Sequence, residues 1–146
     1  MFLGEYEYNI DDKNRLAIPA RFREELGEGV VITRGFDGCL FGFPRPFWEI
    51  LAQQVATLSF GAGETRQLQR MLFSGAAELE FDKQGRVVLP PNLRESAQLA
   101  EAVVLAGVNK YFEIWNPQRW EQQLENLDAN GSLIAQQLQQ LTIQVG

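Results

Sequence analysis

Two short acid–arginine motifs carry the groups in this chain that are best suited to binding chemistry. Asp11 and Arg15 stand four residues apart in DDKNR, and Asp82 and Arg86 repeat that spacing 71 residues later in DKQGR. The fork of an arginine can bind guanine O6 and N7 in the major groove of DNA, or pair with a phosphate. The same acid–arginine pair can also do no more than fasten a turn as an exposed salt bridge, which contributes little to stability.

Polar and basic neighbours of the two arginines favour the binding interpretation. We expect Arg15 and Arg86 to contact DNA, and Asp11 and Asp82 to orient them, because a carboxylate that faces phosphate is repelled. Four flanking side chains are further candidates for DNA contact: Lys13, Asn14, Lys83 and Gln84. Lys13 is expected at a phosphate, with a solvated lysine as the alternative. Lys83 is a weaker candidate because it lies one position out of register with Lys13.

Other prominent side chains have structural explanations. Arg21 and Arg23 fall on a predicted helix, and Arg23 recurs as Arg94, again followed by an acid, so we expect structural ion pairs for Arg21 and Arg23. The single cysteine, Cys39, is expected to be a small buried hydrophobic residue. The large apolar residues are expected in the core or at a subunit interface rather than stacked on bases: Phe22, Leu26, Trp48, Leu93 and Trp120.

Composition argues against catalysis and metal binding. The 146 residues include no histidine, so the commonest general base and metal ligand is missing, and one cysteine cannot build a four-ligand zinc site. No phosphate-binding glycine loop or nucleophile elbow occurs in the sequence. We therefore expect no enzymatic activity, no catalytic residue, no metal, no cofactor and no small-molecule substrate.

Charge and hydropathy limit the partners and the compartment. The formal net charge of −6 disfavours nucleic acid as a partner, yet residues 13–23 contain four basic side chains and no acid. No apolar run is long enough to span a bilayer, and the N-terminus lacks the features of a signal peptide. With a single cysteine as well, we expect a cytoplasmic protein that makes no membrane contact.

The acid–arginine motif belongs to a longer internal repeat. With a shift of 71 residues, Asp11 aligns with Asp82, Arg15 with Arg86, and Pro19 with Pro90. After a slip of one or two residues, VVIT matches VVLA, and CLFGFPRPFWE matches YFEIWNPQRWE. Since about 45 residues correspond in order, a duplicated unit of about 70 residues is indicated, arranged as a pseudo-twofold pair.

Each repeat is predicted to have the element order β-β-α-β-β-α, which makes the fold class α+β. Asn14 and Gly85, the residues that most readily take positive φ, mark a tight turn between the first two strands. Proline at the start of PARFREEL and Gly27 after it suit the ends of a helix, and Asn116–Pro117 suits the start of another. The expected segments are a first repeat over 1–60, a linking helix over 61–75, a second repeat over 76–127 and a C-terminal tail over 128–146, which forms a weak amphipathic helix or is loosely held.

The chain closely resembles the MraZ family, bacterial proteins encoded at the head of the division and cell wall gene cluster, in FLGEYEYNIDDKNRLAIPARFRE, TRGFDGCLF, DKQGRVVLPPNLRE and FEIW. The resemblance covers residues 1 to about 127 and includes both acid–arginine motifs. It implies two SpoVT-AbrB-like repeats that form a swapped-hairpin β-barrel unit with flanking helices, and assembly of subunits into a ring. It also implies a nucleoid-associated transcriptional regulator that binds repeated boxes upstream of its own operon. Asn14 stands where glycine is common in the family, and asparagine tolerates the same backbone.

The leading hypothesis is therefore a sequence-specific DNA-binding regulator that represses its own operon through both motifs. A ring would multiply a weak contact, since linked sites can raise avidity by roughly 10²–10⁴. The alternative is a ring-forming scaffold whose acidic exterior recruits a protein partner. An enzyme ranks third, because adjacent acids such as Asp11 and Asp12 tend to point apart.

Overall fold

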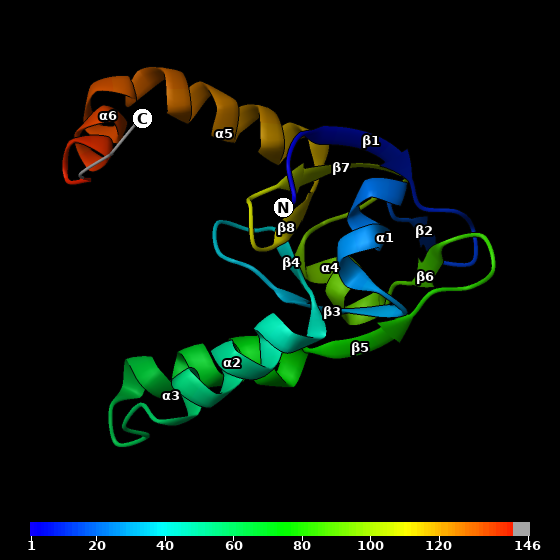
Figure 1. Ribbon diagram of the computed structural model, residues 1–146, viewed down its shortest axis with the longest axis horizontal. Coiled ribbons are helices and arrows are strands. Elements are labelled where there is room, and N and C mark those ends of the chain that lie inside the picture. Colours follow the sequence, from blue (N-terminus) through cyan, green and yellow to red (C-terminus); the bar gives the residue numbers. More distant parts are fainter. Residues whose placement is uncertain (142–146) are drawn as a thin grey trace, which may run out of the picture.

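Strands from the two halves of the chain are interleaved in one antiparallel sheet (Figure 1). The computed structural model describes residues 1–141. The six-stranded sheet has the order β1-β7-β8-β4-β3-β5, and a separate two-stranded ribbon pairs β2 with β6. The strands are β1 (Glu5–Asn9), β2 (Arg15–Ala17), β3 (Gly29–Arg34), β4 (Leu40–Phe43), β5 (Ala77–Glu80), β6 (Arg86–Val88), β7 (Ala102–Gly107) and β8 (Phe112–Trp115).

The first strand of each half pairs with a strand of the other half. In the first exchange β1 pairs with β7, with Glu5 opposite Ala106, and in the second β5 pairs with β3, with Glu80 opposite Gly29. The central pair, β4 with β8, and the β2–β6 ribbon also join the two halves. The predicted α+β fold, with its doubled units and swapped hairpins, is therefore confirmed. The strand pairing has pseudo-twofold symmetry, because the pairing of β1 with β7 has its counterpart in that of β5 with β3, and β2–β6 and β4–β8 each pair equivalent strands.

Two short helices fill the centre of this arrangement. They are α1 (Ala20–Leu26) and α4 (Pro91–Ser96). Pro19 precedes α1 at the N-cap position, and Gly27, with φ of 75°, ends the helix as expected. Phe22 of α1 lies in the core between Phe2 and Phe112, with ring centroids 5.2 Å and 5.1 Å away, respectively.

The main core draws on both halves at once. Phe22, Leu26 and Leu93 are buried in it, as predicted, together with side chains of β2, β3, β4, β6, β7 and β8. Neither half could bury its apolar residues alone, since the other half supplies strands and side chains to the same core. Cys39 is also buried, in a second cluster that contains the half-buried Trp48 and Trp120.

Two helical arms extend from the body on the same side (Figure 1). One consists of α2 (Arg45–Ala56) and α3 (Gly63–Gln69), which continues into a π-helical turn over Arg70–Ser74. The other consists of α5 (Pro117–Ala129) and α6 (Gly131–Gln139). No helix in residues 1–141 is long and apolar enough to cross a membrane. The last part of the expected tail, residues 142–146, lies outside the described residues.

The cap of α5 has the geometry predicted from its sequence. Asn116 accepts hydrogen bonds from the backbone N–H groups of Gln118 (2.9 Å) and Arg119 (3.3 Å), and Pro117 occupies the first helical position. An asparagine cap satisfies amides that have no partner within the helix, and the fixed φ of proline suits the first turn. Local sequence therefore specifies where this arm begins.

We expect Phe22→Ala to lower the free energy of unfolding by about 3–5 kcal/mol, because it opens a cavity in the core that both halves share. Chemical denaturation followed by circular dichroism measures the change. The matched control is Arg21→Ala on the same helix, where the exposed side chain should contribute within about 0.5 kcal/mol. Equal stabilities for the two variants would contradict the shared core.

Candidate nucleic-acid interface

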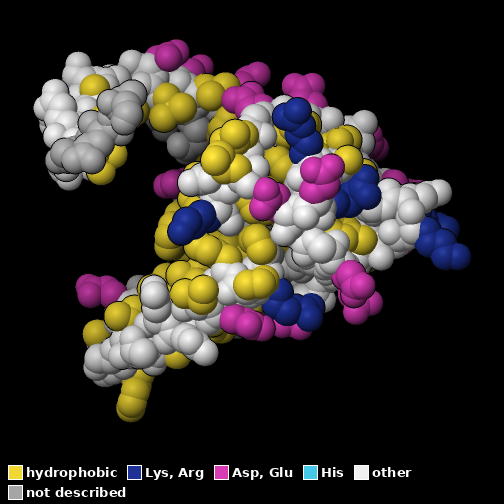
Figure 2. All heavy atoms as spheres, in the orientation of Figure 1, with side chains coloured by type: hydrophobic (Ala, Val, Ile, Leu, Met, Phe, Trp, Pro, Cys, Tyr) yellow, Lys and Arg dark blue, Asp and Glu magenta, His cyan; other side chains and the backbone are white. Residues whose placement is uncertain are grey.

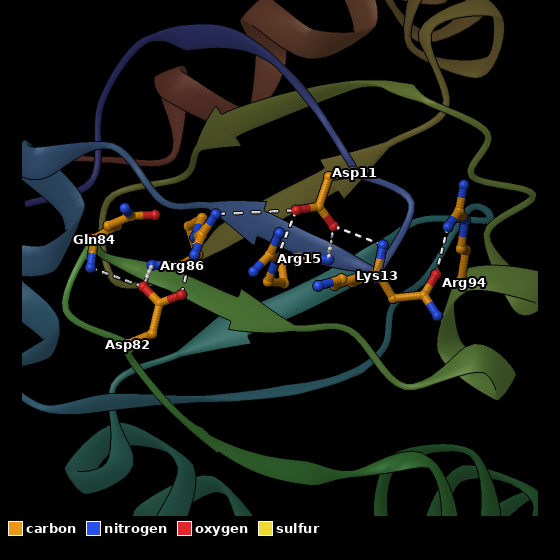
Figure 3. Close-up of polar contacts among 8 residues, drawn as sticks. Asp11, Lys13, Arg15, Asp82, Gln84, Arg86 and Arg94 are labelled. Atoms are coloured by element: carbon orange, nitrogen blue, oxygen red, sulfur yellow. Dashed lines mark hydrogen bonds and ion pairs between the residues drawn. The ribbon is translucent and has the colours of Figure 1, made fainter.

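Each acid–arginine motif forms a tight turn that its aspartate holds together (Figure 3). In the first turn, Asp11 Oδ1 accepts from the backbone N–H groups of Lys13 (2.9 Å) and Arg15 (2.8 Å), and Asp11 Oδ2 accepts from Arg15 Nε at 2.6 Å. The backbone closes the turn, because Asp11 N–H donates to the Arg15 carbonyl at 3.0 Å. One carboxylate thus fixes both the backbone and the arginine side chain.

The second turn repeats these contacts. Asp82 Oδ1 accepts from the backbone N–H groups of Gln84 and Arg86, both at 2.9 Å, and Asp82 Oδ2 accepts from Arg86 Nε at 2.9 Å. Asn14 and Gly85, at equivalent places, have φ of 60° and 75°, as the sequence predicted. The repeated motif therefore corresponds to a repeated three-dimensional structure.

The β2–β6 ribbon brings the two turns together. Arg15 lies opposite Val88, and Arg86 lies opposite Ala17, so the two arginines are diagonal neighbours on one face of the ribbon. Their side chains are 30% and 26% exposed, respectively, which leaves part of each guanidinium open to a ligand. Arg86 Nη1 also lies 4.0 Å from Asp11 Oδ2, so the four charged groups form one cluster across the two halves.

Hydrogen bonding keeps both carboxylates ionised. The pKa of Asp11 falls to about 2, chiefly because the Arg15 backbone N–H stabilises the anion, while burial acts in the opposite direction. The pKa of Asp82 is lowered in the same way, first by the Arg86 backbone N–H. Both arginines therefore remain paired with an anion over the ordinary pH range.

The other predicted contact residues surround these turns. Lys13, Lys83 and Gln84 are exposed, whereas Asn14 is only half-exposed. The side-chain oxygen of Asn14 accepts a hydrogen bond from Arg94 Nη1. A ligand could therefore reach Lys13, Lys83 and Gln84 freely, whereas Asn14 is held by Arg94 from the other half of the chain. Figure 2 shows Lys and Arg side chains at the tip of the body formed by the turns that precede β2 and β6.

Arg23 and Arg94 have a role that the sequence did not reveal. Besides Asn14, Arg94 donates to the carbonyls of Leu99 (3.0 Å) and Ala100 (3.1 Å). Arg23 Nε donates to the carbonyl of Ile18 at 3.1 Å. Its guanidinium covers Gly85, where an added Cβ would lie 2.6 Å from Arg23 Nε. Each helix arginine thus supports the turn of the other half.

The ion pairs expected for Arg21 and Arg23 are therefore wrong: within residues 1–141, neither is paired with an acid. Arg23 instead bonds the carbonyl of Ile18 just before α1, and Arg94 bonds carbonyls just after α4. The recurrence of Arg23 as Arg94, eight residues after each motif arginine, was the signal that could have identified the pair.

Two titratable groups on the far side of the sheet, Cys39 and Glu113, are held by contacts within the chain. The Cys39 thiol donates to the carbonyl of Phe36 at 3.2 Å, and burial raises its pKa well above the usual range. Burial also raises the pKa of Glu113, which accepts from Trp115 Nε1 at 3.1 Å. Across residues 1–141, no group of three or more His, Cys, Asp or Glu side chains is arranged to hold a metal ion.

We expect the Asp11 carboxyl to titrate with a midpoint of about 2, against an ordinary value of 3.8. Because the pKa is lower in the folded state, the ionised group stabilises the turn above about pH 4, and this contribution is lost as the pH falls through about 2. NMR titration of the side-chain carboxyl carbon measures the midpoint directly. A midpoint at the ordinary value would show that the hydrogen bonds to Asp11 do not persist in solution.

Comparison with known proteins agrees with the doubled architecture. The family model for the MraZ protein matches residues 1–71 and again residues 72–142. A transcriptional regulator MraZ from Roseiflexus castenholzii is 64% identical over 141 residues, which cover 97% of this chain and 99% of the relative. A protein of the same name from Pelotomaculum thermopropionicum is 52% identical over 83% of each chain.

A third relative, from Herpetosiphon aurantiacus and also named transcriptional regulator MraZ, is 46% identical over 93% of this chain and 95% of its own length. The similarity therefore extends across both repeats and beyond the acid–arginine turns. With both halves matched by the family model and relatives this similar over nearly their whole length, the chain belongs to the MraZ family.

Proposed function

We propose that this protein is a transcriptional regulator that binds double-stranded DNA through the β2–β6 ribbon and its two turns. The observation that carries the proposal is the placement of Arg15 and Arg86 on one face of the ribbon, each fixed by a carboxylate and each partly exposed. A two-stranded ribbon fits the major groove of DNA, where an arginine fork reads guanine. The relatives named transcriptional regulators support a regulatory rather than an enzymatic role.

The residues around the ribbon divide by the chemistry that each can supply. Arg15 and Arg86 are the base-reading groups, and Asp11 and Asp82 orient them. The exposed Lys13, Lys83 and Gln84 can contact phosphates on either side, which positions the ribbon without specifying sequence. Asn14 supports the first turn through the hydrogen bond that its side-chain oxygen accepts from Arg94, and its remaining exposed part is available for a DNA contact.

The net charge of −6 limits how tightly one ribbon can hold DNA. Several copies in a ring, bound to repeated boxes upstream of the gene, would add their contacts and compensate for this weakness. We therefore propose a ring-shaped homo-oligomer that represses its own operon and resides in the cytoplasm on the nucleoid. For each copy we propose a first repeat over 1–60, a linking helix over 61–75, a second repeat over 76–127 and a C-terminal tail over 128–146.

The helical arms offer the surface for this self-association. In the first half, the apolar side of α2 is covered within the chain, because Leu68, Met71 and Leu72 pack into the same cluster. In the second half, Leu124 and Leu127 of the equivalent α5 are 36% and 52% exposed. Exposed apolar side chains also extend along α6, and Figure 2 shows hydrophobic groups along both arms and on the body between them. A second copy of this chain, which brings apolar arms of its own, is the occupant that we propose for this surface.

A ring-forming scaffold that recruits a protein is the second candidate, favoured by the acidic composition and by the exposed apolar arms. It requires the same oligomer but gives no role to the paired arginines. Binding of DNA from upstream of the gene therefore separates the two candidates.

We expect the double substitution Arg15→Ala and Arg86→Ala to abolish retardation of upstream DNA in a gel-shift assay while the oligomer persists. Loss of one bidentate arginine–guanine pair costs about 1–3 kcal/mol, which is at least about a fivefold loss of affinity for each ribbon engaged. Arg21→Ala combined with Lys110→Ala is the matched control, since it also removes two positive charges, both from exposed sites outside the ribbon. If the double variant binds like the unmodified protein, the ribbon is not the DNA-binding site.

We expect the double substitution Leu124→Glu and Leu127→Glu to dissociate the oligomer, because it places charges on the apolar side of α5. Light scattering coupled to size-exclusion chromatography gives the mass. Gln122→Glu is the control, since Gln122 lies on the opposite side of the same helix. An unchanged mass for the leucine variant would exclude α5 from the subunit interface.

A further inference from the structure

The two acid–arginine turns are equivalent in sequence but not in their contacts. Each aspartate holds the arginine of its own turn, yet Asp11 reaches a second guanidinium as well. Arg86 Nη1 lies 4.0 Å from Asp11 Oδ2, the same oxygen that accepts from Arg15 Nε. Within residues 1–141 Arg15 and Asp82 do not approach each other to within 4.0 Å. The pseudo-twofold symmetry is thus broken at one carboxylate.

Two cations at this separation would otherwise push each other apart. Arg15 and Arg86 are diagonal neighbours across antiparallel strands, where side chains lie close enough to interact. Their charges repel, and each long side chain has several rotamers through which to move away. A carboxylate in contact with both guanidiniums offsets the repulsion and limits how far apart the two can move. Figure 3 shows Asp11 with dashed contacts to both arginines.

We propose that Asp11 is a shared positioning residue that holds Arg15 and Arg86 as one recognition unit, so that DNA meets a coupled pair of forks rather than two independent contacts. The proposal rests on the proposed DNA-binding function. Asp82, by contrast, positions Arg86 alone. The two aspartates, which the repeat makes equivalent in sequence, then have unequal importance for binding.

The first consequence concerns how much each single substitution of an aspartate weakens DNA binding. Asp11→Asn and Asp82→Asn remove the same charge at equivalent places and loosen the same set of backbone contacts. Any general effect of net charge on DNA affinity therefore cancels in their comparison. Loss of Asp11 leaves both arginines less well held, whereas loss of Asp82 leaves Arg86 with its second carboxylate. We expect Asp11→Asn to weaken DNA binding by about two- to tenfold more than Asp82→Asn, which is the lower part of the range for contacting residues, because the contact with Arg86 is a long one.

The second consequence concerns coupling between the halves. Part of the effect of Asp11→Asn acts through Arg86, so that part vanishes once Arg86 has become alanine. In a double-mutant cycle, the losses of DNA affinity that Asp11→Asn and Arg86→Ala cause should therefore be less than additive. The mirror-image cycle, Asp82→Asn with Arg15→Ala, is the matched control and should be additive.

The decisive experiment has one arm without DNA and one arm with it. Without DNA, NMR titration should show a higher pKa for the Asp11 carboxyl in Arg86→Ala than in the unmodified protein. The pKa of the Asp82 carboxyl should be the same in Arg15→Ala as in the unmodified protein. This arm keeps Asp11 in place, so it does not depend on whether Asp11→Asn folds. With DNA, both cycles are measured by fluorescence anisotropy on the sequence upstream of the gene, for variants whose circular dichroism and mass are unchanged.

The outcomes distinguish failure of this proposal from failure of the proposed function. An Asp11 titration that is identical in Arg86→Ala, or an additive Asp11–Arg86 cycle, overturns the shared role. If the unmodified protein binds no upstream DNA, the proposed function fails and a coupled recognition unit fails with it. The titration then still decides whether Asp11 contacts both arginines.

Discussion

The exchange of strands between the two halves is the constraint on which the rest of this structure depends. Because β1 pairs with β7 and β5 with β3, neither half can bury its apolar residues alone, and both contribute to one core. The same exchange places β2 beside β6. The only described ribbon that carries two arginines on one face is therefore a product of interleaving, not of either repeat.

Within the interleaved fold, short hydrogen bonds and ion pairs position the arginines of the two turns. Each turn is organised by one carboxylate that accepts two backbone hydrogen bonds and one from an arginine, which keeps the acid ionised and the fork oriented. Arg23 and Arg94 then brace the turn of the opposite half. Preorganisation of this kind lowers the entropy lost when a flexible arginine binds a ligand, which matters for a protein of net negative charge.

Charged and apolar side chains are exposed on different parts of the molecule, which suits those parts to different kinds of binding. The turns present basic and polar side chains at one end, while the helical arms extend apolar residues from the body elsewhere (Figures 1 and 2). A contact that is weak in one copy gains from repetition only if copies are held together. In the proposed regulator, self-association through the arms and DNA contact through the ribbon therefore depend on each other.

The sequence by itself determined the duplicated unit, the positive φ of Asn14 and Gly85, the stop at Gly27 and the cap at Asn116, because each depends on local chemistry. It also pointed to both acid–arginine pairs. Only the tertiary structure decided which strands pair, that Arg94 reaches Asn14, and that Arg86 approaches Asp11 rather than only its own aspartate. The physical reason is that the alternation of apolar and polar residues, together with the turn residues, specifies a strand and its buried face. The backbone hydrogen bonds of a strand, by contrast, are the same whichever strand it pairs with. The choice of partner, and every contact that follows from it, is set by how the whole core packs.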